Sequence, residues 1–130
     1  MEEKKRDIYY FAGTHWDREW YQTFQQFRYR LVDMLDELVE TMENDPSLGV
    51  FHLDGQTIVM EDYAEINPEG AERLKKLVAQ GRVKIGPWYV MPDEFLVSGE
   101  SLIRNLMIGH RLSKKWGAEE AWKFGYICDI

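Results

Sequence analysis

The sequence GVFHLDGQTIVMEDYAEINPEGAERLKKLVAQGRVKIG, residues 49–86, predicts two short apolar strands separated by two helices. The expected elements are a strand at 49–53, a helix at 57–66, a second helix between Asn67 and Gly81, and a strand at 83–86. Strands that alternate with crossover helices are typical of a parallel sheet. The expected fold class is therefore α/β.

The sequence on either side of this region continues the same alternation. Residues 8–12 are apolar on both faces, which is typical of a buried parallel strand, and a further strand is expected at residues 124–128. Amphipathic helices are expected from Phe27 to Met42 and from Ser101 to Trp116, where apolar residues recur at helical spacing. Repeated βα units with parallel strands form either an open doubly wound sheet or part of a barrel.

Composition narrows the class of protein. The chain has 130 residues and a net charge of -7, with 23 acidic against 16 basic residues, which argues against a nucleic-acid partner. The single cysteine, Cys128, excludes an intrachain disulfide and fits a reducing, cytoplasmic compartment. The charged start of the chain lacks the apolar core of a secretory signal. No apolar run approaches the roughly 20 residues that span a bilayer, so no membrane partner is expected.

Polar and aromatic residues follow each expected strand. Residues 13–21, 54–57 and 87–94 are three such loops, and Asp129 follows the last strand. The carboxyl ends of parallel strands lie at one rim, where α/β proteins place their working loops. Carboxylates, a histidine and aromatic rings that converge there are typical of a sugar-processing or metal-dependent site.

His15, Asp17 and Asp129 are the candidates for metal binding and catalysis. In an extended segment His15 and Asp17 point the same way and could chelate one ion, and such a pair suits zinc. Alternatively, His15 is a hydrogen-bonded loop residue and Asp17 caps a helix. Asp129, at the end of an apolar strand, could be a nucleophile, a metal ligand or a helix cap.

Trp20, Trp88 and Asp54 are the candidates for substrate binding. Either tryptophan could stack on a sugar or cover the core, and Asp54 could contact a hydroxyl or shape its turn. Strand alternation points Cys128 away from Asp129, so Cys128 is expected to be a buried packing residue.

These loops together resemble a known family. THWDREWY, residues 14–21, resembles a signature of the bacterial family 38 glycoside hydrolases, the zinc-dependent α-mannosidases. The resemblance continues in order through residues 52–57, 86–94, 98–106 and 125–129, so it covers nearly the whole chain.

The resemblance implies that residues 1–130 are the amino-terminal part of a catalytic domain, the first half of a seven-stranded α/β barrel. It implies that His15 and Asp17 are zinc ligands, and that Trp20 stacks near the bound sugar. Asp129 would be the catalytic nucleophile and also touch the zinc. The remaining zinc ligand and the general acid/base are expected beyond Ile130, so the 130 residues alone are expected to be inactive.

The implied reaction is retaining hydrolysis of α-D-mannosides through a covalent mannosyl-enzyme. A hydrolase of small mannosides such as mannosylglycerate is an alternative within the family. A zinc-dependent carbohydrate deacetylase and a non-catalytic sugar-binding fragment are alternatives from other classes. The full-length protein could be a homo-oligomer.

Overall fold

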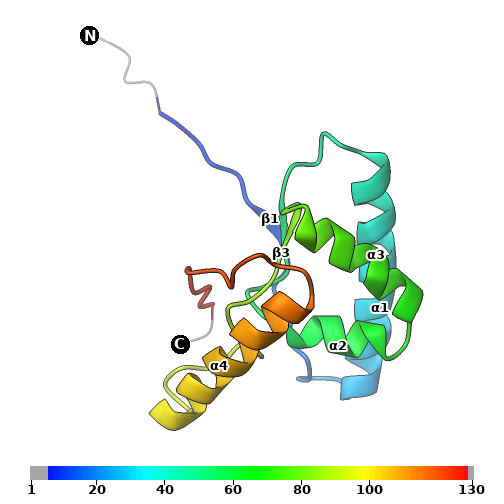
Figure 1. Cartoon of the computed structure of the whole chain (residues 1–130). Coiled ribbons are helices and arrows are strands. Elements are labelled where there is room, and N and C mark those ends of the chain that lie inside the picture. Colours follow the sequence, from blue (N-terminus) through cyan, green and yellow to red (C-terminus); the bar gives the residue numbers. More distant parts are fainter. Residues whose placement is uncertain (1–5, 129–130) are drawn as a thin grey trace.

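The computed structural model describes residues 6–128, which form a small parallel sheet and four helices. The elements, in chain order, are β1 (Ala12–Gly13), α1 (Phe24–Asn44), β2 (Phe51–His52), α2 (Ile58–Ala64), α3 (Pro68–Ala79), β3 (Val83–Lys84) and α4 (Gly99–Lys115) (Figure 1). The sheet order is β1-β2-β3, with Ala12 opposite Phe51 and Phe51 opposite Val83. The predicted α/β class with parallel strands is confirmed.

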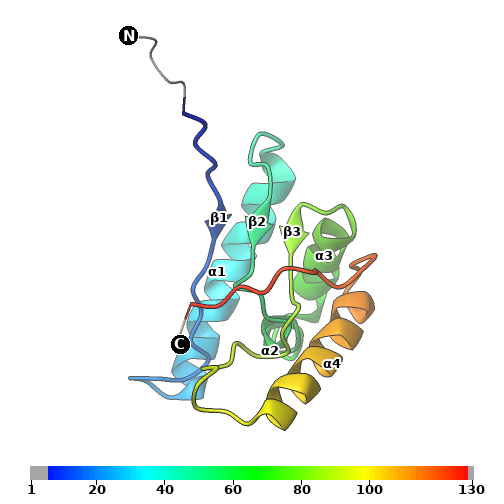
Figure 2. The same ribbon diagram turned by 90° about the vertical axis from the view of Figure 1, so that its left-hand side faces the viewer.

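Helices α1, α2 and α3 and the end of the described chain lie on opposite faces of this sheet. Helices α1, α2 and α3 cover one face, and the segment that follows α4 crosses the other face (Figure 2). Within residues 6–128, no helix combines the length and the apolar character needed to cross a membrane.

Apolar spacing and end signals explain the helices. Helix α1 buries one stripe, which comprises Phe27, Leu31, Leu35, Leu38, Val39 and Met42. Helix α3 begins after Asn67, whose Oδ1 accepts a hydrogen bond from the Gly70 N–H at 2.9 Å. It ends just before Gly81, which adopts a positive φ of 74°.

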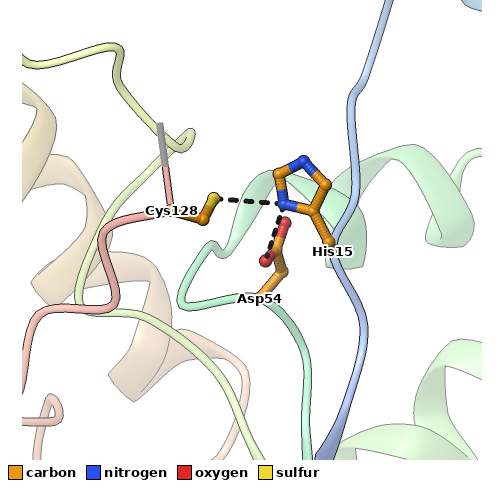
Figure 3. A group of neighbouring side chains, drawn as sticks. All are labelled: His15, Asp54 and Cys128. Carbon is orange, nitrogen blue, oxygen red and sulfur yellow. Dashed lines mark hydrogen bonds and ion pairs between the residues drawn. The ribbon is translucent and has the colours of Figure 1, made fainter. Parts of the chain in front are cut away.

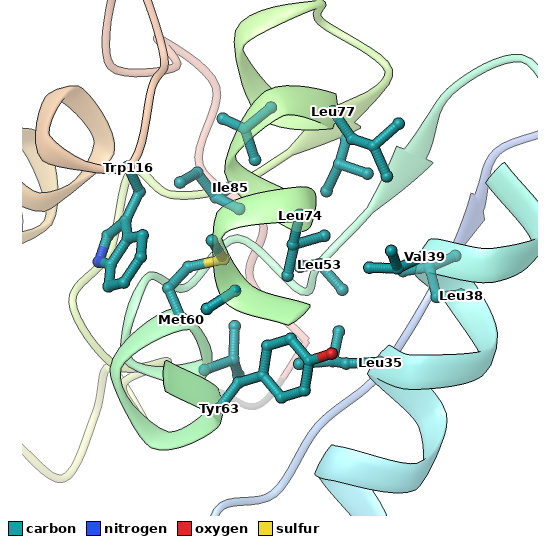
Figure 4. Packing of buried hydrophobic residues seen from close by; sticks show 14 of the residues in the cluster. Leu35, Leu38, Val39, Leu53, Met60, Tyr63, Leu74, Leu77, Ile85 and Trp116 are labelled. Atoms are coloured by element: carbon teal, nitrogen blue, oxygen red, sulfur yellow. The ribbon is translucent and has the colours of Figure 1, made fainter. Parts of the chain in front are cut away.

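The core lies between α1, α2, α3 and the sheet (Figure 4). Leu35, Met60, Tyr63 and Leu74 are completely buried there. Trp116, just after α4, closes the same cluster. This packing fixes the strand ends, from which the loops of the candidate site emerge.

The strand predicted at residues 8–12 is wrong except at Ala12. Residues 8–11 are exposed, with Ile8 at 92%. Strand β1 is at the edge of the sheet and pairs only with β2 among the described residues. Nothing in the described part of the chain therefore covers this apolar segment.

The strand predicted at residues 124–128 is also wrong, because this segment crosses the sheet without joining it. Side-chain contacts hold it instead. The Trp88 Nε1–H donates to the Tyr126 carbonyl at 3.1 Å, and the His52 ring lies 4.8 Å from Trp122 and 5.6 Å from Tyr126 between centroids. Three strands are described, so the seven-stranded barrel stays a prediction.

Candidate functional site

The loop that follows β1 is fixed by side chains from the turn after β2 and from α2. The Trp16 N–H donates to Asp54 Oδ2 at 2.6 Å, and Gln56 Nε2 donates to the Trp16 carbonyl at 2.8 Å. The Arg18 guanidinium donates to both oxygens of Asp62, at 2.7 and 2.9 Å. Asp17 lies between these two anchored residues, and His15 directly precedes Trp16.

The two ring nitrogens of His15 face different partners. Nε2 lies 3.6 Å from Asp17 Oδ1, whose side chain is partly exposed. Nδ1 lies 3.8 Å from Asp54 Oδ1 and 3.1 Å from Cys128 Sγ (Figure 3). His15 is partly exposed, whereas the Asp54 side chain is completely buried.

The His15–Asp17 pair has the separation that a zinc ion needs. Two nitrogen or oxygen ligands at about 2.1 Å from a tetrahedral zinc lie about 3.4 Å apart, and the observed separation is 3.6 Å. A second possible donor set comprises His15, Asp54 and Cys128, whose ligand atoms all lie within 4.8 Å of one another. Asp129, the third predicted ligand, lies outside the described residues.

Asp54 is a buried carboxylate in an unusual backbone conformation. Burial raises the pKa of Asp54, and the hydrogen bond from the Trp16 N–H opposes this shift. Oδ2 accepts from Trp16 and from Gln56 Nε2, but Oδ1 has no hydrogen-bond partner among the described residues. Asp54 has a φ of 49° and Gly55 of 66°, so Asp54 also shapes the turn after β2.

An open cavity of about 950 Å³ lies over this loop. Its lining includes His15, Asp17, Trp20, Gln56 and Cys128. Trp20 is 74% exposed, so its ring face is available to a ligand. Trp88 is 6% exposed and buried beneath the chain end. The structure thus brings His15, Asp17 and Trp20 together at the rim and places Asp54 below them.

Cys128 was expected to be a buried packing residue, and this is wrong. It is half-buried and its sulfur contacts the His15 ring. The expectation relied on strand alternation, which does not apply because residues 124–128 are not in a strand.

Gln56 is a site residue that the sequence patterns did not single out. Its side chain is completely buried and donates to Trp16 and Asp54, while its Oε1 accepts from the Met91 N–H at 3.2 Å. Gln56 therefore joins the loop after β1 to the loop after β3. Its position directly after the Asp54–Gly55 turn was the signal available in the sequence.

A comparison with known protein families shows to which family this chain belongs. The sequence model of the glycosyl hydrolases family 38 N-terminal domain matches residues 5–130. The chain belongs to glycosyl hydrolase family 38. A relative from Halalkalibacterium halodurans, named "Putative mannosylglycerate hydrolase", is 41% identical over 125 residues. The match covers 96% of this chain but 14% of the relative's length.

Two solved structures from Enterococcus faecalis are similar to this chain. One is an alpha-mannosidase from Enterococcus faecalis V583, with 48% identity and a TM-score of 0.79. The other is a family 38 protein from Enterococcus faecalis, with 44% identity and a TM-score of 0.75. Each match covers 83% of this chain and 12% of the solved chain.

Proposed function

We propose that this chain is the amino-terminal part of the catalytic domain of a zinc-dependent, retaining α-mannosidase. The observation that carries the proposal is the His15–Asp17 pair, 3.6 Å apart beside the exposed Trp20, in a family 38 chain. The similarity to an alpha-mannosidase at 48% identity supports the substrate class. We further propose that residues 1–130 supply the first strands of a seven-stranded barrel, of which β1, β2 and β3 are described.

In this proposal His15, Asp17 and Asp129 hold the zinc ion, and Trp20 stacks on the sugar. When bound, the ion supplies positive charge that orients the sugar hydroxyls and favours the ionised form of the nucleophile. Arg18 acts indirectly, because its pair with Asp62 holds the loop on which Asp17 lies. Sugar contacts by Asp54 and Trp88 stay predictions, since both side chains are buried among the described residues.

Asp129 is proposed as the nucleophile. Its carboxylate oxygen forms a bond to the anomeric carbon while the bond to the leaving oxygen breaks, and that oxygen takes a proton from a general acid. Water then attacks the same carbon, releases Asp129 and returns a proton to the now basic partner. We place this partner and the remaining zinc ligand in other parts of the whole protein.

Hydrolysis of mannosylglycerate is the second candidate function. The observation that favours it is the name of the Halalkalibacterium halodurans relative, which matches 96% of this chain. Both candidates use the same site residues and differ in the leaving group.

A cytoplasmic location and a homo-oligomeric whole protein are also proposed, the first from the single cysteine.

The test compares hydrolysis of a nitrophenyl α-mannoside and of mannosylglycerate by the whole protein that contains these residues. We expect turnover of the nitrophenyl substrate, loss of at least about 10³-fold in kcat for Asp129→Ala, and loss of zinc for His15→Ala. His110→Ala is the matched control, because His110 is an exposed histidine on α4. Its zinc content and rate should equal those of the unsubstituted protein.

Three outcomes would redirect the proposal. Strict preference for mannosylglycerate would favour the second candidate. Sugar binding without turnover of either substrate would indicate a non-catalytic sugar-binding protein. Full zinc content in His15→Ala would remove the ligand assignment. The 130 residues alone are expected to show no turnover.

A further inference from the structure

We propose that Asp54 is a positioning residue that orients the His15 ring for metal binding. In the metal-loaded protein, Asp54 Oδ1 accepts a hydrogen bond from the protonated His15 Nδ1, and this leaves the lone pair of Nε2 directed toward the ion. The inference rests on the proposed function, because it assumes that His15 is a metal ligand.

The first support is the way in which Asp54 is held. Its Oδ2 accepts two hydrogen bonds, from the Trp16 N–H at 2.6 Å and from Gln56 Nε2 at 2.9 Å. Both hydrogen bonds go to Oδ2. They fix the direction of Oδ1 and leave it available to accept a hydrogen bond. The carboxylate therefore has a set orientation that does not depend on His15.

The second support is the position of the other oxygen. Oδ1 is buried and has no hydrogen-bond partner among the described residues, and His15 Nδ1 faces it at 3.8 Å. A buried oxygen without a donor lowers the stability of the fold, because its lost hydration is not replaced. The present separation is too long for a hydrogen bond, and a turn of the partly exposed His15 ring toward Asp54 would supply the missing donor.

The third support is the opposite side of the same ring. Nε2 faces Asp17 Oδ1 at 3.6 Å on the side of the open cavity. A proton on Nδ1 leaves Nε2 as the acceptor nitrogen, which is the form of imidazole that binds a metal. The two carboxylates thus have separate roles: Asp17 shares the ion with His15, and Asp54 sets the tautomer.

A different arrangement is possible at Nδ1, because Cys128 Sγ lies 3.1 Å from that nitrogen. A metal ion bound there would take His15, Asp54 and Cys128 as ligands. We favour the Nε2 side because the Asp54 carboxylate is completely buried and already held by Trp16 and Gln56, whereas Asp17 is partly exposed. The experiment separates the two arrangements.

The variant is Asp54→Asn in the whole protein. Asparagine keeps an oxygen for Trp16 and Gln56 and tolerates the positive φ of this position. Its amide N–H₂ would face His15 Nδ1 and favour the tautomer with the proton on Nε2. We expect the zinc dissociation constant to rise about 10- to 100-fold.

Asp62→Asn is the matched control. Asp62 is also a buried carboxylate in this region, but it pairs with Arg18. Because this pair holds the loop on which Asp17 lies, Asp62→Asn measures the loss that a loosened loop alone causes, and we expect a smaller rise in its zinc dissociation constant than in Asp54→Asn. An equal loss in both variants would show that any damage to the loop lowers affinity, and would overturn the positioning role.

Two spectroscopic readouts do not depend on activity. In the unsubstituted protein loaded with zinc, ¹⁵N NMR of the histidine rings should show His15 protonated at Nδ1 and metal-bound at Nε2. The reverse assignment would overturn the proposal even if Asp54→Asn failed to fold. With Co²⁺ as the probe, a thiolate-to-cobalt charge-transfer band that disappears in Cys128→Ser would place the ion at Nδ1 and overturn it as well.

The outcomes also separate this inference from the proposed function. Zinc on Nε2 of His15 with no mannosidase activity would contradict the function and leave the positioning role intact. Mannosidase activity of the whole protein, with unchanged zinc affinity in Asp54→Asn, would support the function and contradict the positioning role.

Discussion

The half-buried ring of His52 affects how the free energy of unfolding depends on pH. It lies on β2, against Trp122 and Tyr126 of the segment that crosses the sheet. Burial lowers the pKa of His52 below its ordinary value of 6.5. The unfolded chain therefore binds a proton at a higher pH than the folded chain does.

The sign of the effect follows from this difference. Because the unfolded state binds more protons as the pH falls below about 6.5, the free energy of unfolding decreases in that range. We expect this decrease to be smaller in His52→Gln. Urea unfolding at about pH 7.5 and about pH 5 measures it, with His110→Gln as the exposed control. Equal pH dependence in His52→Gln and the unsubstituted chain would contradict the prediction.

Helix α4 packs on the backbone of the loop that follows β3. A Cβ atom added at Gly109 would overlap the Pro87 carbonyl oxygen and the backbone of Trp88 and Tyr89. The same loop is held by Asn105 Oδ1, which accepts from the Tyr89 N–H at 2.6 Å. Close approach of a helix to a loop explains why glycine is at this position.

We expect Gly109→Ala to lower the free energy of unfolding by about 1–3 kcal/mol. In an exposed helix the change from glycine to alanine would raise the free energy of unfolding by about 1 kcal/mol. The steric overlap at Gly109 must therefore cost more than this gain. Gly99→Ala is the control, since nothing lies within 4 Å of a Cβ at Gly99. Chemical denaturation of both variants checks the prediction, and a Gly109→Ala variant as stable as Gly99→Ala would refute it.

The helices could be predicted from the sequence more closely than the strands. A stripe such as Leu31, Leu35 and Leu38 has a local period, and each helix forms its own backbone hydrogen bonds. A strand needs a neighbour, which local sequence does not show. Residues 8–11 and 124–128 have strand-like composition, but no strand pairs with them among the described residues.

The candidate site, too, could be predicted from the sequence only in part. His15 and Asp17 could be found because they are two positions apart in one loop, and the structure brings them together. The contacts of Asp54, Gln56 and Cys128 with that loop join residues far apart in sequence. Burial of Trp88 under Tyr126 likewise depends on the path of the chain end.

The exposed apolar segment at residues 8–11 gives a prediction for the whole molecule. These residues flank β1, whose outer edge pairs with no strand among the described residues. In the proposed barrel this edge is paired in the whole protein. We expect fast amide hydrogen exchange at residues 8–11 in the 130-residue chain and slow exchange in the whole protein.

Mass spectrometry of exchanged peptides measures this difference. Peptides from α1, which is held by the described core, serve as the internal reference and should exchange slowly in both proteins. Equally fast exchange at residues 8–11 in the whole protein would contradict the proposed pairing.

The contacts by which Asp54, Gln56 and Asp62 hold the loop after β1 also determine how much conformational entropy is lost when the site forms. The pairing of Ala12 with Phe51 already closes the long excursion of the chain through α1. Counted from that pair, the bond from Trp16 to Asp54 closes only a few additional residues on each strand. Short additional closures are entropically inexpensive. The loop that carries His15 and Asp17 therefore loses most of its conformational entropy when the chain folds. Ligand binding need not supply the free energy to order it.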